Sequence, residues 1–193
     1  MPTNVRLTAV LGSVTPPGRL RRAVSEALER TAAGGLAEVE LIDLAEQRIS
    51  FADGRPPKVL DDDTRSVVAA LARADAVLLA SPVYRGSLTG ALKNLLDHVP
   101  VPALQGKPTA IVAMGGSDHH YLGAERHLRD VLAFFGAHSL PTAVYLTGRD
   151  FADGAPGGRA SRELDALLAG VVAVAVALRD ALPVGPAPLG AGF

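Results

Sequence analysis

Three segments of the sequence combine glycine with hydroxyl or basic side chains, as ligand-binding loops do. In the first, residues 12–19, the hydroxyls of Ser13 and Thr15 and the guanidinium of Arg19 could hold an anion. Backbone N–H groups at the start of a helix also donate to anions, and arginine can bind phosphate through two parallel hydrogen bonds. The segment matches neither GxGxxG nor GxxxxGKS/T, which argues against a dinucleotide-binding Rossmann domain and a nucleotide triphosphatase. We therefore predict an anion-binding loop, with a simple turn as the alternative.

The second segment, residues 81–87, reads Ser-Pro-Val-Tyr-Arg-Gly-Ser and continues into an apolar helix. A planar heteroaromatic ligand at this place would contact four consecutive residues, Pro82, Val83, Tyr84 and Arg85. Backbone N–H groups here could also stabilise negative charge that forms on such a ring. The alternative is that Tyr84 and Arg85 are ordinary loop residues.

The third segment, residues 115–121, begins with two glycines that would let the backbone approach the edge of a ligand closely. Its candidate ligand contacts are Gly115, Gly116, Ser117 and His120. A nucleophilic Ser117 is rejected because a nucleophile elbow needs glycine two residues later, where this chain has His119. A metal site is disfavoured because the histidines here have no converging carboxylate or third ligand. The remaining alternative is that the glycines only turn the chain.

These segments each follow a short apolar run, and segments with helical periodicity separate the runs. We expect strands at residues 5–11, 39–43, 76–80, 109–114 and 142–146, and helices at residues 20–31, 64–74, 88–98, 120–135 and 161–182. Alternating strands and helices predict an α/β domain, a doubly wound five-stranded parallel sheet of order 2-1-3-4-5 with helices on both faces. Ligands bind such sheets at the carboxyl ends of the strands, where the three segments lie. One domain is expected over residues 1–182, followed by a Pro/Gly-rich tail at 183–193.

Composition narrows the function classes. The chain of 193 residues carries a net charge of -1 with interspersed signs, so we expect no nucleic-acid partner and no attraction to anionic lipid. The longest apolar run, residues 167–178, is about 12 residues, short of the roughly 20 that span a membrane. Without cysteine there is no disulfide or thiol redox chemistry, so electron transfer would need an organic cofactor. Residues 1–6 lack the layout of a signal peptide, and the expected location is the cytoplasm.

The second segment and the helix after it resemble the NADPH-dependent FMN reductases of flavodoxin-like fold. The matching residues are Ser81 to Arg85, Gly90 and Leu92 to Asp97, and the resemblance extends over about residues 5 to 150. The family includes the reductase partners of two-component flavin monooxygenases. The first segment is less similar, since Thr15, Gly18 and Leu20 stand where the family commonly has Arg and Ser.

The resemblance implies an NAD(P)H-dependent FMN reductase that transfers a hydride from NADPH, with NADH possible, to FMN. Stacking and exclusion of water would carry this reaction, and we assign no catalytic acid or base. The implied phosphate contacts are Ser13, Thr15 and Arg19. The implied ring contacts are Pro82, Val83, Tyr84, Arg85, Gly115, Gly116 and Ser117. The implied contacts on the nicotinamide side are Arg85 and His120. Arg19, Arg21 and Arg22 could favour NADPH, or could simply be solvated helix residues.

Two further expectations come from the resemblance. Residues 115–132 have the length of family members that carry one extra helical residue, here Arg126 or His127, as a π-type bulge. That would favour release of reduced FMN to a partner monooxygenase. A homodimer or homotetramer is expected through residues 88–99 and 121–135, unless both apolar stripes pack on their own sheet. The alternatives are an FMN-bound quinone or azo reductase and a non-enzymatic electron carrier resembling flavodoxin.

Overall fold

A computed structural model describes residues 5–15, 17–180 and 185–188. Its parallel sheet contains β1 (Arg6–Leu11), β2 (Glu38–Asp43), β3 (Ala76–Pro82), β4 (Pro108–Met114), β5 (His138–Ser139) and β6 (Val144–Leu146). The strand order is β2-β1-β3-β4-β5, and β6 also pairs with β4. The predicted order 2-1-3-4-5 is confirmed. The edge differs from the single strand expected at residues 142–146, because two extra residues interrupt its pairing with β4: Ser139 lies opposite Thr109, whereas Val144 lies opposite Val112.

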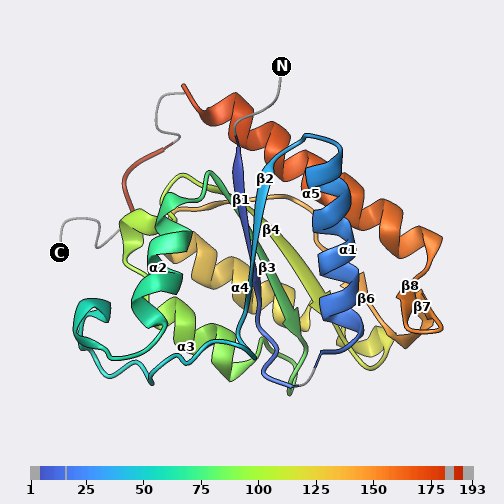
Figure 1. Cartoon of the computed structure of the whole chain (residues 1–193), viewed down its shortest axis with the longest axis horizontal. Helices are drawn as coiled ribbons and strands as arrows, with labels where there is room; N and C mark the ends of the chain where they lie inside the picture. Colours follow the sequence, from blue (N-terminus) through green and yellow to red (C-terminus); the bar gives the residue numbers. More distant parts are fainter. Residues whose placement is uncertain (1–4, 16, 181–184, 189–193) are drawn as a thin grey trace.

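Five helices cover the sheet in two layers (Figure 1). On one face lie α1 (Arg19–Ala33) and α5 (Gly158–Leu178), and on the other lie α2 (Thr64–Arg73), α3 (Gly90–His98) and α4 (Gly123–Phe134). Short 3-10 turns occupy Pro57–Val59, Val101–Ala103, Asp118–His120 and Gly148–Asp150. A small antiparallel hairpin, β7 (Phe151–Ala152) with β8 (Ala155–Pro156), precedes α5.

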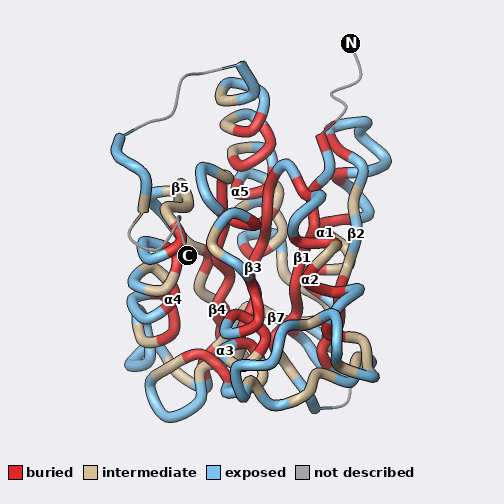
Figure 2. The backbone as a smooth tube through the Cα atoms, turned by 90° about the vertical axis from the view of Figure 1, so that its left-hand side faces the viewer, coloured by how far each residue is buried: buried red, intermediate tan, exposed pale blue. Residues whose placement is uncertain are grey.

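The central strands are apolar on both faces because helices cover both. Along β3, Ala76, Leu78 and Ala80 join the core under α1 and α5, whereas Val77 and Leu79 join the core under α2, α3 and α4. Each of these side chains is at most 1% exposed. Figure 2 shows the buried residues gathered along the sheet. This burial fixes the positions of the strand ends, from which the three candidate loops emerge.

Several predicted helix boundaries were wrong. α3 begins at Gly90, because Thr89 caps it, and not at Leu88. α4 begins at Gly123 rather than His120, after a 3-10 turn and a left-handed Leu122 with φ of 69°. It is α-helical throughout, so the expected π-type bulge is absent from residues 123–134.

The end of the chain is only partly described. α5 ends at Leu178, and residues 179–180 form a turn, so the expected continuation is wrong there, while 181 and 182 lie outside the described residues. Of the predicted tail, only residues 185–188 are described. Pro188 lies 3.2 Å from the position that a Cβ on Gly136 would take. Among the described helices, none is long and apolar enough to cross a membrane.

Candidate functional site

The loops that follow β1 and β3 enclose a cavity of about 270 Å³ at the carboxyl ends of the strands. Five residues predicted from the sequence line it: Ser13, Thr15, Arg19, Pro82 and Tyr84. Met114, at the end of β4, lines it too, so all three central strands contribute. The other six predicted residues, Val83, Arg85, Gly115, Gly116, Ser117 and His120, do not line this cavity. They lie in the segments that follow β3 and β4.

One end of the cavity suits an anion. The hydroxyls of Ser13 and Thr15 lie 2.8 Å apart. The N-cap of α1, Gly18, makes no side-chain cap hydrogen bond, so N–H groups of the first turn are left for a ligand. The dipole of this 15-residue helix also favours negative charge there. Together these donors fit a phosphate group.

The three arginines near this end differ in their contacts. Arg21 is 2.9 Å from the buried Asp43 carboxylate and also pairs with Glu46, and Arg22 pairs with Glu26. The guanidinium of Arg19 instead lies over the ring of Phe151, 5.6 Å from its centroid. Arg19 is therefore the guanidinium of this group that can turn to a ligand without leaving a carboxylate.

Thr89 joins the first loop to the second, a role that the sequence analysis missed. This buried hydroxyl donates to the Gly12 carbonyl and accepts from the Leu92 N–H at 3.2 Å, while the Thr89 N–H donates to Ser81 Oγ at 3.1 Å. Threonine before a helical Gly90 is an N-cap signal that could have indicated part of this role. The contact with Gly12 depends on the parallel alignment of β1 with β3.

The second loop is a tight hairpin. Tyr84 and Ser87 exchange backbone hydrogen bonds of 2.9 and 3.0 Å. Arg85 and Gly86 between them have φ of 53° and 75°, which is the pattern of a type I′ turn. The Tyr84 ring remains 46% exposed at the mouth of the cavity. A ligand ring can therefore reach it.

The start of α4 packs against this hairpin. A Cβ on Gly123 would lie 2.9 Å from the Gly86 carbonyl oxygen, so only glycine allows this approach. His127 Nδ1 is 2.7 Å from Ser87 Oγ. Ser117 Oγ is 3.4 Å from His120 Nδ1 in the neighbouring loop. No cluster of three potential metal ligands occurs within the described ranges.

The two glycines of the third loop, Gly115 and Gly116, have different surroundings. A Cβ on Gly115 would lie 1.9 Å from the Tyr145 hydroxyl oxygen, which donates to the Ser117 carbonyl at 2.6 Å. Burial raises the pKa of Tyr145, and the Asp118 charge raises it further, so this hydroxyl stays protonated and donating. A Cβ on Gly116, by contrast, would have no neighbour within 4 Å. Gly115 therefore makes room for Tyr145, and Gly116 is the position open to a ligand.

Comparison with known proteins finds flavin reductases among the relatives of this chain. The NADPH-dependent FMN reductase family matches residues 5–152. An NAD(P)H-dependent FAD/FMN reductase of Geobacillus thermodenitrificans is 38% identical over 108 residues, which are 56% of this chain and 58% of that protein. The NADH-dependent FMN reductase SfnF of Pseudomonas putida is 32% identical over 148 residues, 76% of this chain and 80% of SfnF.

A solved structure extends the comparison to the fold. The apo form of an NADH:FMN oxidoreductase, EMOB, superposes with a TM-score of 0.74 and 23% identity, covering 89% of this chain and 90% of that one. This likeness shows the fold, and the family match over residues 5–152 shows the family. The chain belongs to the NADPH-dependent FMN reductase family, the NAD(P)H:FMN oxidoreductases of flavodoxin-like fold.

Proposed function

We propose that this chain binds FMN with its phosphate in the loop after β1 and its ring against Tyr84, and reduces it with NAD(P)H. The convergence of Ser13, Thr15 and Arg19 with Pro82 and Tyr84 around one cavity supports this proposal. When bound, FMN supplies the hydride acceptor. The residues of the chain orient the two rings, which must stack at about 3–3.5 Å, and exclude water between them.

Each loop has its own part in this proposal. The type I′ hairpin holds the backbone of Tyr84 and Arg85, and we assign the Arg85 guanidinium to the nicotinamide side together with His120. Gly116 and Ser117 approach the ring edge, and Val83 contributes backbone. The Val83 N–H donates to the Met114 carbonyl at 2.8 Å and the Val83 side chain packs against the core under α2, α3 and α4, so its carbonyl oxygen is the group that can face a ligand.

The phosphate assignment is tested by comparing FMN with riboflavin, which lacks the phosphate. NADH and NADPH oxidation is followed at 340 nm with each flavin. We expect Ser13→Ala to raise the Michaelis constant for FMN about tenfold, equivalent to one charge-assisted hydrogen bond, and to leave riboflavin unchanged. Ser66→Ala, on the remote helix α2, is the matched control. Equal effects on both flavins would contradict a phosphate contact.

We further propose that FMN is a substrate that leaves after reduction and serves a flavin-dependent monooxygenase. The exposure of the Tyr84 ring supports release, because no described segment closes over it. Sequential kinetics with added FMN are expected. Ping-pong turnover of a quinone or azo dye without free FMN would favour the rival enzyme with tightly held FMN. Absence of NAD(P)H oxidation with added FMN would favour the electron carrier. Cell fractionation tests the expected cytoplasmic location.

We keep the homodimer or homotetramer as a proposal, but the surface proposed for the contact between subunits changes. The apolar residues Leu92, Leu95 and Leu96 of α3 and Leu128 and Leu132 of α4 are buried against their own sheet. A subunit contact through α4 would therefore use its outer face, where Phe134 is 60% exposed. Light scattering should give a multiple of the monomer mass, and Phe134→Ser should lower it. A monomeric wild-type protein would contradict the proposal.

A further inference from the structure

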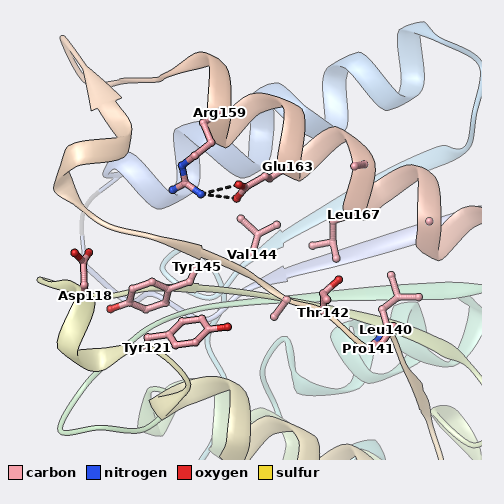
Figure 3. Close-up of a pocket in the computed structure, with 13 residues that line it drawn as sticks. Asp118, Tyr121, Leu140, Pro141, Thr142, Val144, Tyr145, Arg159, Glu163 and Leu167 are labelled. Carbon is pink, nitrogen blue, oxygen red and sulfur yellow. Dashed lines mark hydrogen bonds and ion pairs between the residues drawn. The ribbon is translucent and has the colours of Figure 1, made fainter.

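A second, larger cavity of about 820 Å³ lies between the sheet edge and α5 (Figure 3). We call it the edge groove. Its volume is within the range of sites that hold organic ligands. The residues that line it are Asp118, Tyr121, Leu140, Pro141, Thr142, Ala143, Val144, Tyr145, Arg159, Glu163, Ala166, Leu167 and Gly170. None of the predicted FMN contacts is among them.

One wall of the edge groove is aromatic and is connected to the third loop. Tyr121 is 60% exposed and lies edge-on to Tyr145, with ring centroids 5.7 Å apart. Tyr145 in turn donates to the Ser117 carbonyl. One loop therefore contributes to both places, with Ser117 assigned to the proposed ring site and Asp118 and Tyr121 lining the edge groove. An exposed aromatic face at such a place can stack on a heterocyclic base.

The charged groups in and beside the edge groove are already paired. Arg159 donates to both oxygens of Glu163 at 2.7 Å and also pairs with Asp150, and Arg149 pairs with Asp118 at 2.6 Å. Burial alone would raise the pKa of Asp150, but hydrogen bonds from Arg159 and Thr147 outweigh it and lower that pKa. Among the residues that line the edge groove, the carboxylates of Asp118 and Glu163 and the guanidinium of Arg159 give a net charge of -1.

We propose that the edge groove binds the adenosine half of the pyridine nucleotide and favours NADH over NADPH. Adenine stacks on Tyr121 over the apolar floor of Val144 and Leu167, and ribose hydroxyls donate to the Glu163 carboxylate. A carboxylate on the ribose hydroxyls is the usual mark of a site for NADH, whereas a 2′-phosphate needs an unpaired arginine. The inference rests on the proposed function, because it assigns a place to the second substrate of that reaction.

The kinetic test uses reduced nicotinamide mononucleotide, which carries the hydride but has no adenosine. Ala166 is exposed and lines the groove, so Ala166→Trp fills the groove without entering the core. We expect the Michaelis constant for NADH to rise at least about tenfold, with those for reduced nicotinamide mononucleotide and FMN unchanged. The matched control is Ala173→Trp, exposed on the same helix and not part of the groove lining. Equal shifts for both nucleotides, or no shift, would overturn the inference.

A binding test needs no turnover. ADP-ribose, which lacks nicotinamide, is titrated into the protein by calorimetry. We expect saturable binding that Ala166→Trp abolishes and that FMN does not displace. Glu163→Gln is expected to narrow the preference for ADP-ribose over its 2′-phosphate, because one repelling charge is gone. Absence of ADP-ribose binding to the wild-type protein refutes the groove assignment. Binding of ADP-ribose by a protein that reduces no FMN would refute the proposed function and leave the groove assignment standing.

Discussion

Gly115 offers a direct test of why the third loop contains glycine. In Gly115→Ala the new Cβ would lie 1.9 Å from the Tyr145 hydroxyl oxygen, whereas ordinary contacts begin near 3.4 Å. The hydroxyl must therefore retreat by about 1.5 Å, the difference between these two distances, and its hydrogen bond to the Ser117 carbonyl breaks. Tyr145→Phe removes the same oxygen without adding any atom. The effects of the two substitutions on the unfolding free energy should therefore not be additive.

The expected magnitudes follow from these contacts. Loss of the Tyr145 hydrogen bond costs about 0.5–1.5 kcal/mol. Overpacking at Gly115 adds about 1–3 kcal/mol, so Gly115→Ala should destabilise by about 1.5–4.5 kcal/mol. After Tyr145→Phe the nearest remaining ring atom is Cζ at 2.9 Å, a milder clash. The double variant should therefore be more stable than the sum of the single effects by at least about 1 kcal/mol.

Urea unfolding of FMN-free protein measures these quantities. If Gly115 serves only the approach of FMN, Gly115→Ala would leave the unfolding free energy of the FMN-free protein unchanged and raise only the Michaelis constant for FMN. That result, or strict additivity with Tyr145→Phe, would contradict a steric role of Gly115 toward Tyr145. Gly116→Ala is the control, because its Cβ would meet no atom within 4 Å. The unfolding free energy of Gly116→Ala should stay within about 1 kcal/mol of the wild-type value, and the substitution should weaken FMN binding instead.

Three further predictions concern the other loops. Thr89→Ala should lower the unfolding free energy by about 1–2 kcal/mol in urea, and Thr89→Ser should restore it, because serine keeps the cap of α3. Gly86→Ala should lower the unfolding free energy by about 1–2 kcal/mol, because φ is 75° at Gly86, and should also raise the Michaelis constant for FMN. The control Gly54→Ala, with φ of 89° in a remote turn, should lower the unfolding free energy alone. Asp62 accepts hydrogen bonds from Ser50 and Thr64 that hold its pKa well below the usual range, so its stabilisation is present above about pH 4 and fades as the pH falls. Asp62→Asn should lower the melting temperature at pH 7, and a difference from wild type that persists undiminished at pH 2 would contradict this.

The order of strands and helices and the places of the three loops could be predicted from the sequence alone. Apolar runs such as residues 76–80 form central strands because both of their faces must leave water, and that requirement is visible in the local composition. Parallel strands bring their carboxyl ends to one edge, so Ser13 and Tyr84 could be placed together from their positions after such runs. The anion donors at the start of α1 are likewise properties of one short segment.

Which of these residues are left available to a ligand depends on contacts between segments far apart in the chain. Arg19 and Arg21 look alike in sequence, but Asp43 pairs with Arg21 and leaves Arg19 over Phe151. Gly115 and Gly116 are neighbours, yet Tyr145 on another strand explains the first and open space the second. The edge groove likewise joins the 118–121 turn to α5 across the sheet edge. The periodicity of apolar residues shows which face of each segment is buried. The contacts of Arg21, Gly115 and the edge groove, by contrast, form only when segments far apart in the chain meet.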